Sequence, residues 1–318
     1  MNHIQQVTVF GGSGFVGRAI VRALAQQGLQ VRVACRRPEL AEVTKTAGDV
    51  GQVVLMRANL RMPQSIGAAI AGSQAVVNAT GIPFQKGRQK YQSVHVAGAR
   101  ALADAATAAG VRRLIHISGI GADDRGSHNP FVKSKVEGES AIVAGFPAAT
   151  ILRPSVVFGP DDKFFNRLAQ AALQAPFMPL VGSGTARVQP VYDADVGRAV
   201  VAVLERPATT FGVFELGGPR IYTYRELAEL ILREIDRTKR IVSVPAGLLK
   251  LAAFFAEFLP VPPITRDQVE LMVHDNVVRE GAQTFATLGI EPTAVEPILP
   301  VYLDRYRHGG RYNQHAPV

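Results

Sequence analysis

The stretch VTVFGGSGFVG (7–17) decides the fold class, because it joins a strand to a glycine-rich turn. Its first part, VTVF (7–10), is β-branched and aromatic, which suits a strand buried on both faces of a parallel sheet. Helical apolar spacing follows over 18–28, and VRVAC (31–35) predicts a second strand. Strand, glycine turn, helix and strand within about 30 residues are the context of a site for dinucleotide phosphates.

The three glycines of this turn, Gly11-x-x-Gly14-x-x-Gly17, have separate predicted roles. Gly11 permits the tight turn, Gly14 allows the pyrophosphate to approach the backbone, and Gly17 lets the helix pack on the strand. Backbone amides at the helix start would bind phosphate through the helix dipole. The turn could also serve only to reverse the chain, but its context favours nucleotide binding.

The residues after the second strand predict which dinucleotide is used. An NAD site usually places a carboxylate there for the ribose hydroxyls, whereas this chain has Arg36 and Arg37. Because the guanidinium fork matches a phosphate, we expect NADP(H) to be favoured over NAD(H), with Arg36 on the 2′-phosphate. Alternatively, one arginine is solvated and Glu39 turns inward.

The rest of the first half alternates strands and helices. Strands running into loops are predicted at 52–60, 75–81, 112–121 and 149–159, with helices at 92–110 and 131–145. This alternation predicts an α/β fold, a Rossmann doubly wound parallel sheet with a ligand crevice at the carboxyl ends of its strands. Residues expected beside the adenine are Asn59 and Leu60, and those beneath the nicotinamide ribose are Ala79, Thr80 and Gly81. Ordinary loop chemistry is the alternative for both groups.

The second half predicts a smaller, mostly helical C-terminal lobe. A threonine-capped helix is expected at 223–237, and a more apolar helix at 247–260 is too short to span a bilayer. The apolar helix could lie on a membrane, dock on a partner or be buried against the sheet domain. The expected division is a nucleotide-binding core at 1–160, a lobe at 161–307 with one or more segments returning to the core sheet, and a flexible tail at 308–318.

Composition excludes several classes of protein. The 318 residues contain one cysteine, so no internal disulfide can form, and the seven histidines show no metal-ligand spacing. The net charge of +9 is spread without a basic run, which argues against nucleic acid. It leaves attraction to an acidic membrane surface or partner open. With no signal-peptide pattern and no membrane-spanning apolar stretch, we expect a cytoplasmic protein.

Several motifs together resemble the extended, atypical short-chain dehydrogenase/reductase superfamily, which includes NAD-dependent epimerases and dehydratases. They are GGSGFVG, VVNATG, HISGIGAD, LRPSVVFGPDD and RVQPVYDADVGRAVVAVLE. More narrowly, FQKGRQKYQSVHVAGARALADAA, PPITRDQVELMVHDNVV and LGIEPTAVEPILPVYLDRYR resemble the branch containing the nucleotide-binding accessory subunit of respiratory complex I and its bacterial relatives. The resemblance covers residues 4–305 and implies a membrane-associated respiratory partner, with the protein peripheral at the inner membrane.

The resemblance also implies roles around HNPFVKSKVE (128–137). In catalytic relatives a serine holds the substrate carbonyl, a tyrosine transfers a proton, and a lysine four residues later binds the nicotinamide ribose. Ser118 matches the serine and Lys135 the lysine, but Phe131 occupies the tyrosine position. Loss of a general acid typically costs about 10²–10⁴ in rate. The pattern implies a nucleotide-binding accessory or assembly factor of a respiratory or quinone-related complex, lacking tyrosine-dependent catalysis.

An active NADPH-dependent reductase or isomerase of a hydrophobic carbonyl or quinone-like substrate is the alternative. Lys135 would then be the acid, with a pKa lowered by desolvation. His128, Lys133 or Asp123 could instead supply a proton, or each could be an ordinary solvated side chain. The complete set of expected nucleotide-binding residues is Gly11, Ser13, Gly14, Phe15, Val16, Arg36, Arg37, Asn59, Leu60, Ala79, Thr80, Gly81, Ser118, Lys135, Pro154 and Val156.

Overall fold

The computed structural model describes residues 4–206 and 211–307, so the tail expected at 308–318 lies outside the described residues. Two compact units are present. The first comprises the described parts of Met1–Pro154, Asp193–Leu216 and Arg279–Glu291. The second comprises the described parts of Ser155–Tyr192, Gly217–Val278 and Pro292–Val318.

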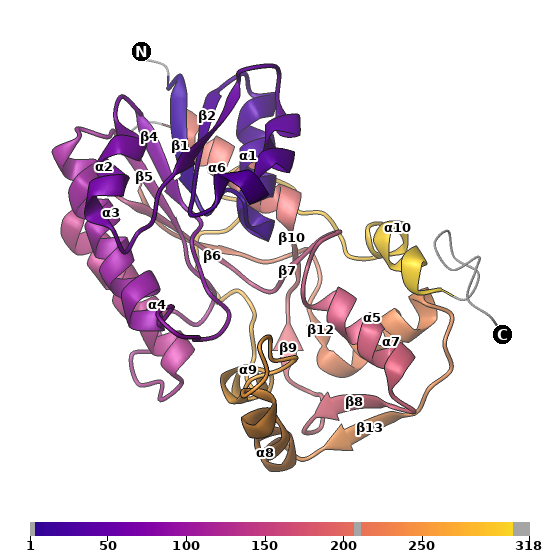
Figure 1. The fold of residues 1–318 in the computed structure, drawn as a ribbon. Coiled ribbons are helices and arrows are strands. Elements are labelled where there is room, and N and C mark those ends of the chain that lie inside the picture. Colours follow the sequence, from indigo (N-terminus) through magenta and orange to yellow (C-terminus); the bar gives the residue numbers. More distant parts are fainter. Residues whose placement is uncertain (1–3, 207–210, 308–318) are drawn as a thin grey trace. The chain divides into compact units, whose positions relative to one another are not determined.

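A parallel sheet forms the centre of the first unit (Figure 1). Seven strands pair within the described residues, in the spatial order β11 (Gly212–Leu216), β6 (Thr150–Pro154), β5 (Arg113–Ile117), β4 (Ala75–Asn78), β1 (Gln6–Phe10), β2 (Gln30–Cys35) and β3 (Val53–Arg57). The strand order reverses between β1 and β4, which is where ligands bind in doubly wound sheets. The predicted Rossmann fold is confirmed.

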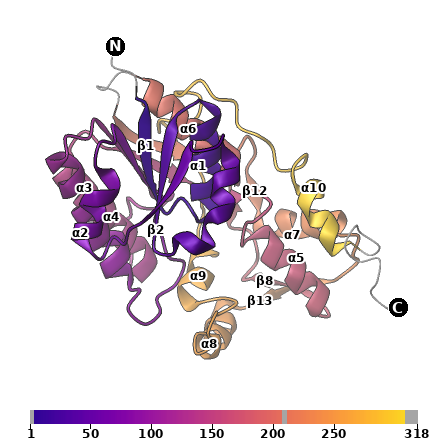
Figure 2. The same ribbon diagram turned by 45° about the horizontal axis from the view of Figure 1, so that its top comes forward.

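Helices cover both faces of this sheet (Figures 1 and 2). One face carries α1 (Phe15–Gln26) and α6 (Asp193–Glu205), and the other carries α2 (Pro63–Ile70), α3 (Ala97–Ala108) and α4 (Pro130–Gly145). A Cβ atom at Gly197 of α6 would lie 2.8 Å from the carbonyl oxygen of Ala19, so this glycine lets the two helices pack closely. On the opposite face, Ile66, Ile70 and Leu102 are buried in one apolar core.

Short helical turns and a returning segment complete the first unit. The 3₁₀ turns η1 (Pro38–Leu40) and η2 (Glu42–Ala47) follow β2, and the π-helical turn η3 (Gln92–Val96) leads into α3. The predicted helix at 92–110 is therefore not regular throughout. Beyond β11, the segment Arg279–Glu291 returns to the sheet edge, where the Glu215 amide donates to the Gln283 carbonyl over 2.8 Å.

The second unit is built from short strand pairs and helices. Its strands are β7 (Val157–Phe158), β8 (Met178–Val181), β9 (Arg187–Val188), β10 (Val191–Tyr192), β12 (Tyr222–Thr223) and β13 (Ile241–Val244). Its helices are α5 (Phe165–Gln174), α7 (Tyr224–Glu234), α8 (Ala246–Ala256), α9 (Arg266–Leu271), α10 (Leu299–Leu303) and the 3₁₀ turn η4 (Asp304–Tyr306). The expected threonine cap is present: Thr223 and Glu226 form a reciprocal capping box at the start of α7.

The apolar helix expected at 247–260 forms α8 but is poorly covered. Ala253 is its only buried residue. Large apolar side chains are exposed in α8 and the segment after it, at Leu248, Leu251, Phe254, Phe255, Phe258, Leu259 and Val261. Within the second unit, this helix is therefore not buried. Within the described ranges, no helix is long and apolar enough to cross a membrane.

Candidate nucleotide-binding site

A pocket lies at the carboxyl ends of the central strands of the first unit. Nine of the expected nucleotide-binding residues line it: Gly11, Ser13, Gly14, Arg36, Asn59, Leu60, Ala79, Thr80 and Gly81. Residues that the sequence did not single out also line it, namely Phe10, Ala34, Cys35, Ala58, Arg61, Ile82, Gln89 and Val94. The loops that follow β1, β2, β3 and β4 thus contribute to one concave surface.

The glycine turn brings backbone close to this pocket. Gly11 has a φ of +76°, a conformation that side chains disfavour, and a Cβ there would lie 2.7 Å from the Ala79 carbonyl oxygen. A Cβ at Gly17 would lie 2.0 Å from the Gly11 carbonyl oxygen, so α1 can start here only without a side chain. Phe15 and Val16 form the first turn of α1, whose leading amides lack partners within the helix. This arrangement suits an anionic ligand.

Two guanidiniums give the pocket a positive charge. Partial burial, followed by the charges of Arg61 and Arg37, lowers the pKa of Arg36. Glu39, the alternative ribose ligand, instead forms an exposed ion pair with Arg57, with nitrogen and oxygen 3.6 Å apart. Arg37 is exposed where η1 begins. The carboxylate that could have neutralised the arginines is therefore turned to another partner.

Among the pocket-lining residues that the sequence did not predict, Arg61 is the charged one. It lies beyond β3, and its guanidinium donates to the Arg88 carbonyl over 3.0 Å. The signal that could have found it is the strand order, because β3 is the neighbour of β2. The loops after adjacent parallel strands lie at the same sheet edge, which places Arg61 near Arg36.

Ser118 lies directly after β5 and is buried. Its amide donates to the Leu152 carbonyl over 2.8 Å, but its hydroxyl oxygen has no hydrogen-bond partner among the described residues. Buried hydroxyls are normally satisfied, so an unpaired one indicates a place for a ligand's polar group. Pro154 ends β6 nearby, where its carbonyl accepts from the Ile120 amide. Val156 belongs to the second unit and packs against the core of that unit.

Lys135 is half-buried on α4, one turn after Phe131. The side chain of Asn129 accepts hydrogen bonds from the Phe131 and Val132 amides and so sets the start of this helix. The Lys135 ammonium lies 5.8 Å from the centre of the Phe131 ring, and a Cβ at Gly81 would be 3.9 Å from its nitrogen. Burial lowers the pKa of Lys135 to about 8, although the charge of Glu139 acts to raise it.

Phe131 occupies an aromatic cluster rather than an open slot. Its ring meets Tyr91 edge-on with centroids 5.6 Å apart, and it meets His95 edge-on at 5.8 Å. Tyr91 and His95 stack on each other at 5.3 Å. The position that would carry a proton-donating phenol therefore presents an apolar ring held between two others.

His95 is held as a neutral imidazole. Ser134 donates its hydroxyl proton to the Phe131 carbonyl, so its oxygen accepts from Nδ1 of His95 at 2.8 Å. Nε2 accepts from the Ile82 amide at 3.0 Å. Burial, the charge of Lys135 and His116 lower the pKa of His95 to about 3. Both ring nitrogens are therefore committed to structural hydrogen bonds, which leaves His95 unable to act as an acid.

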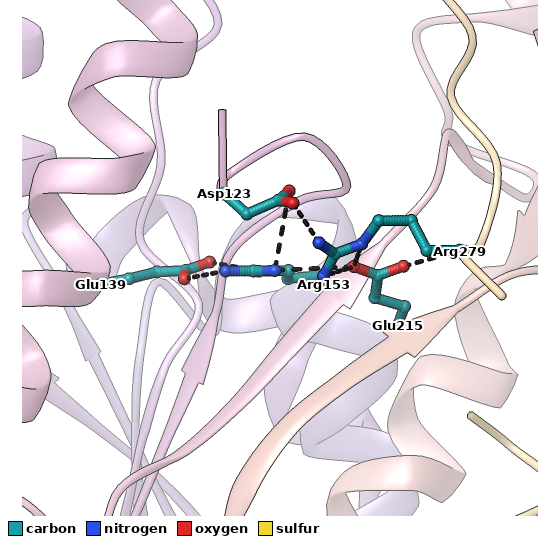
Figure 3. Close-up of polar contacts among 5 residues, drawn as sticks. All are labelled: Asp123, Glu139, Arg153, Glu215 and Arg279. Carbon is teal, nitrogen blue, oxygen red and sulfur yellow. Dashed lines mark hydrogen bonds and ion pairs between the residues drawn. The ribbon is translucent and has the colours of Figure 1, made fainter. Parts of the chain in front are cut away.

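The other candidate proton donors are either exposed to solvent or engaged in ion pairs. His128 and Lys133 are exposed. Asp123 forms ion pairs with Arg279 and with Arg153, the latter at 3.7 Å (Figure 3). Its carboxylate is thus engaged by two guanidiniums rather than directed at the lysine. Among the described residues, no cluster of histidine, cysteine and carboxylate side chains suits a metal ion.

Comparison with known proteins identifies the family to which the chain is similar. The NmrA-like family matches residues 3–295. The 40 kDa subunit of NADH-ubiquinone oxidoreductase from Neurospora crassa mitochondria is 35% identical, over 96% of this chain and 80% of the relative. Ceramide reductase from Caulobacter vibrioides is 31% identical, over 78% of this chain and 76% of the relative.

A solved structure supports the fold. The dTDP-glucose 4,6-dehydratase of Bacillus anthracis, in complex with NAD, superimposes with a TM-score of 0.72 over 95% of this chain and 96% of that one. At 19% identity this likeness shows the fold of the extended short-chain dehydrogenase/reductases and nothing finer. With its Rossmann sheet, its glycine turn and full-length relatives, the chain belongs to the NmrA-like family, in the branch of the respiratory complex I accessory subunits.

Proposed function

We propose that this protein is an NADP(H)-binding accessory or assembly subunit of a membrane-bound respiratory complex, peripheral at the inner membrane, and that it lacks tyrosine-dependent catalysis. The observation that carries the proposal is the pairing of Phe131 with Lys135. The lysine suited to a ribose is retained, whereas the phenol is replaced by a ring packed between Tyr91 and His95. The residue suited to nucleotide binding is thus retained, whereas the proton-donating tyrosine is absent.

Support for the nucleotide comes from the shape and charge of the pocket. The glycine turn leads into the first turn of α1, whose leading amides lack partners within the helix. Ser118 offers an unpaired hydroxyl, and Lys135 lies beside Gly81. Arg36 and Arg61 supply two guanidiniums where an NAD site would place a carboxylate. A charged fork gains more from a 2′-phosphate than from a ribose hydroxyl. The dinucleotide we propose is therefore NADP(H).

Support for the accessory role comes from the relatives and from α8. A relative 35% identical over nearly the whole chain is a subunit of NADH-ubiquinone oxidoreductase. The ring of Phe254 meets those of Phe255 and Phe258, with centroids 5.4 Å and 5.5 Å apart, and all three are exposed. Together with the exposed Leu251, we call these residues the apolar strip. Contiguous exposed apolar surfaces of this kind mark docking sites. We assign this strip to the contact with the membrane-bound complex.

A second candidate function is reduction with Lys135 as the acid. The pKa of about 8 keeps its ammonium present at neutral pH yet ready to release a proton. A relative named ceramide reductase shares 31% identity with this chain. With NADPH bound as the hydride donor for the substrate carbonyl carbon, the Lys135 ammonium would give its proton to the carbonyl oxygen. Ser118 would hold that oxygen.

Single-turnover oxidation of bound NADPH separates the two functions. The parent protein, Phe131→Tyr and Lys135→Ala are each mixed with a panel of aldehydes, ketones, quinones and a long-chain keto-sphingoid base. We expect little or no oxidation by the parent and weaker NADPH binding by Lys135→Ala. Phe131→Tyr restores the phenol on the lysine face and is expected to gain weak activity. Rapid turnover by the parent, lost in Lys135→Ala at saturating NADPH, would establish the reductase instead.

A further inference from the structure

Five charged side chains of the first unit form a connected group of ion pairs (Figure 3). Arg153 of β6 forms a two-pronged ion pair with Glu139 of α4, with nitrogen–oxygen distances of 2.9 Å and 2.7 Å. Its remaining nitrogen faces Glu215 of β11 at 3.5 Å and Asp123 at 3.7 Å. Arg279 pairs with the same two carboxylates, contacting Glu215 at 2.7 Å. We call these five residues the charge network.

The charge network is not neutral by itself. Three carboxylates face two guanidiniums, which leaves one negative charge. Glu139, Arg153 and Glu215 have side chains that are only 8%, 8% and 1% exposed, so water screens this charge weakly. Lys135 lies four residues before Glu139 on α4, hence on the same helical face. The positive charge of the Lys135 ammonium balances this one negative charge, so the charge network and the lysine together are neutral.

The other groups that face Lys135 do not carry a compensating charge. His95, from η3, and His116, from β5, both interact electrostatically with the lysine. The Asn78 amide donates to Nδ1 of His116 over 3.1 Å, which requires that nitrogen to be unprotonated. His95 is neutral for the reasons given above. Glu139 on α4 is therefore the anion that balances Lys135, and Arg153 reduces the effect of that anion.

We propose that Glu139 is a positioning residue that keeps Lys135 protonated for the nucleotide, and that Arg153 and Arg279 set how strongly it does so. The inference deepens the proposed nucleotide site and rests on it for its consequence. A protonated lysine offers three donors to the ribose hydroxyls, whereas the neutral amine offers fewer and weaker ones. NADPH affinity is then set by residues that do not touch the nucleotide.

The direction in which each substitution moves the titration midpoint of Lys135 distinguishes an electrostatic role of Glu139 from a merely structural one. Removing the charge of Glu139 in Glu139→Gln leaves Lys135 without its counter-ion, so its titration midpoint should fall by about one pH unit or more. Arg153→Gln breaks the same buried ion pair but removes a positive charge that opposes the effect of Glu139 on Lys135, so the midpoint should rise by a similar amount. Arg279→Gln, in a half-exposed position, should raise it by a few tenths of a unit.

The measurement is the pH titration of the Lys135 ¹³Cε resonance in the nucleotide-free protein, assigned by its absence in Lys135→Arg. Opposite shifts in Glu139→Gln and Arg153→Gln support the proposal. Shifts in the same direction, or an unmoved midpoint in Glu139→Gln, overturn it. If either buried variant fails to fold, Arg279→Gln decides the question, because an unmoved or lowered midpoint there also overturns the proposal.

NADPH binding is then measured from pH 6 to 9 for the same proteins. The affinity of the parent should fall by about tenfold as Lys135 loses its proton, and this fall should move with the resonance midpoint in each variant. Resonance shifts without any change in affinity would mean that Lys135 does not hold the nucleotide. That outcome contradicts the proposed function and overturns the role of Glu139 in binding, although the charge network would still tune the lysine.

Discussion

At the scale of single residues, the proposed preference for NADP(H) depends on two arginines. Arg36 and Arg61 line it, while Glu39 is paired with Arg57. A charge-assisted contact is worth about 1.5–3 kcal/mol. We expect the parent to bind NADPH more tightly than NADH, and Arg36→Ala to reduce that preference by roughly tenfold or more. Titration calorimetry with both nucleotides checks this, and Arg100→Ala, at an exposed arginine outside the pocket lining, is the matched control. Equal affinities in the parent contradict the assignment.

The glycine turn supports a second test at the residue scale. A ligand that binds only the folded protein raises its stability, by about 2.7 kcal/mol at a hundred times its Kd. Gly14→Val places two methyl groups where the pyrophosphate would approach, so NADPH should no longer raise the melting temperature. Gly67→Val is the control, since a Cβ there meets no atom within 4 Å. An NADPH shift retained by Gly14→Val would place the nucleotide elsewhere.

At the scale of elements, α8 carries the prediction about partners. Leu251 and Phe255 are 57% and 64% exposed, so replacing both with aspartate removes little packing within the protein. Leu251→Asp/Phe255→Asp should fold and bind NADPH as the parent does. It should nonetheless be lost from the membrane fraction and from the purified respiratory complex, because two charges interrupt the apolar strip. Leu40→Asp, at another exposed leucine, is the control. Undiminished membrane association by the double variant would exclude α8 as the docking surface.

At the scale of the whole molecule, two buried histidines link stability to pH. The pKa values of His95 and His116 are lowered to about 3, chiefly by burial, from an ordinary 6.5. Below pH 6.5 the unfolded chain gains protons that the folded chain does not accept, so stability falls as the pH decreases towards 3. Each histidine should contribute about 1 kcal/mol per pH unit in that window.

Urea unfolding of the parent from pH 7.5 to 4.5 measures this dependence. His95→Gln removes one of the two titrations, so it should show a shallower loss of stability on acidification, even if it starts less stable. His128→Gln, at an exposed histidine, is the matched control variant. A parent that is equally stable at pH 7 and pH 5 would show that neither histidine is neutral by burial.

The presence of the central strands and their parallel direction followed from local patterns. Apolar β-branched runs such as VTVF, each leading into a turn, predict buried parallel strands whatever their neighbours are. The glycine turn, the cap at Thr223 and the strand–helix alternation are equally local, since each depends on residues within a few positions. For these reasons the six strands β1 to β6, the helices α1, α3 and α4, and the nine pocket-lining residues could be predicted from the sequence, whereas strand β11 and helix α2 were not.

Contacts between distant segments were decided only by the tertiary structure. Arg61 reaches the pocket because β3 pairs with β2, and residues 92–96 form a π-helical turn whose His95 contacts both Ile82 and Ser134. The charge network joins residues from 123 to 279, and none of its pairs has a sequence pattern. By itself the sequence determined the doubly wound fold and the replacement of tyrosine by Phe131. The protonation of Lys135 depends on charges brought within a few ångströms by folding, because only buried charges at short range act strongly on one another.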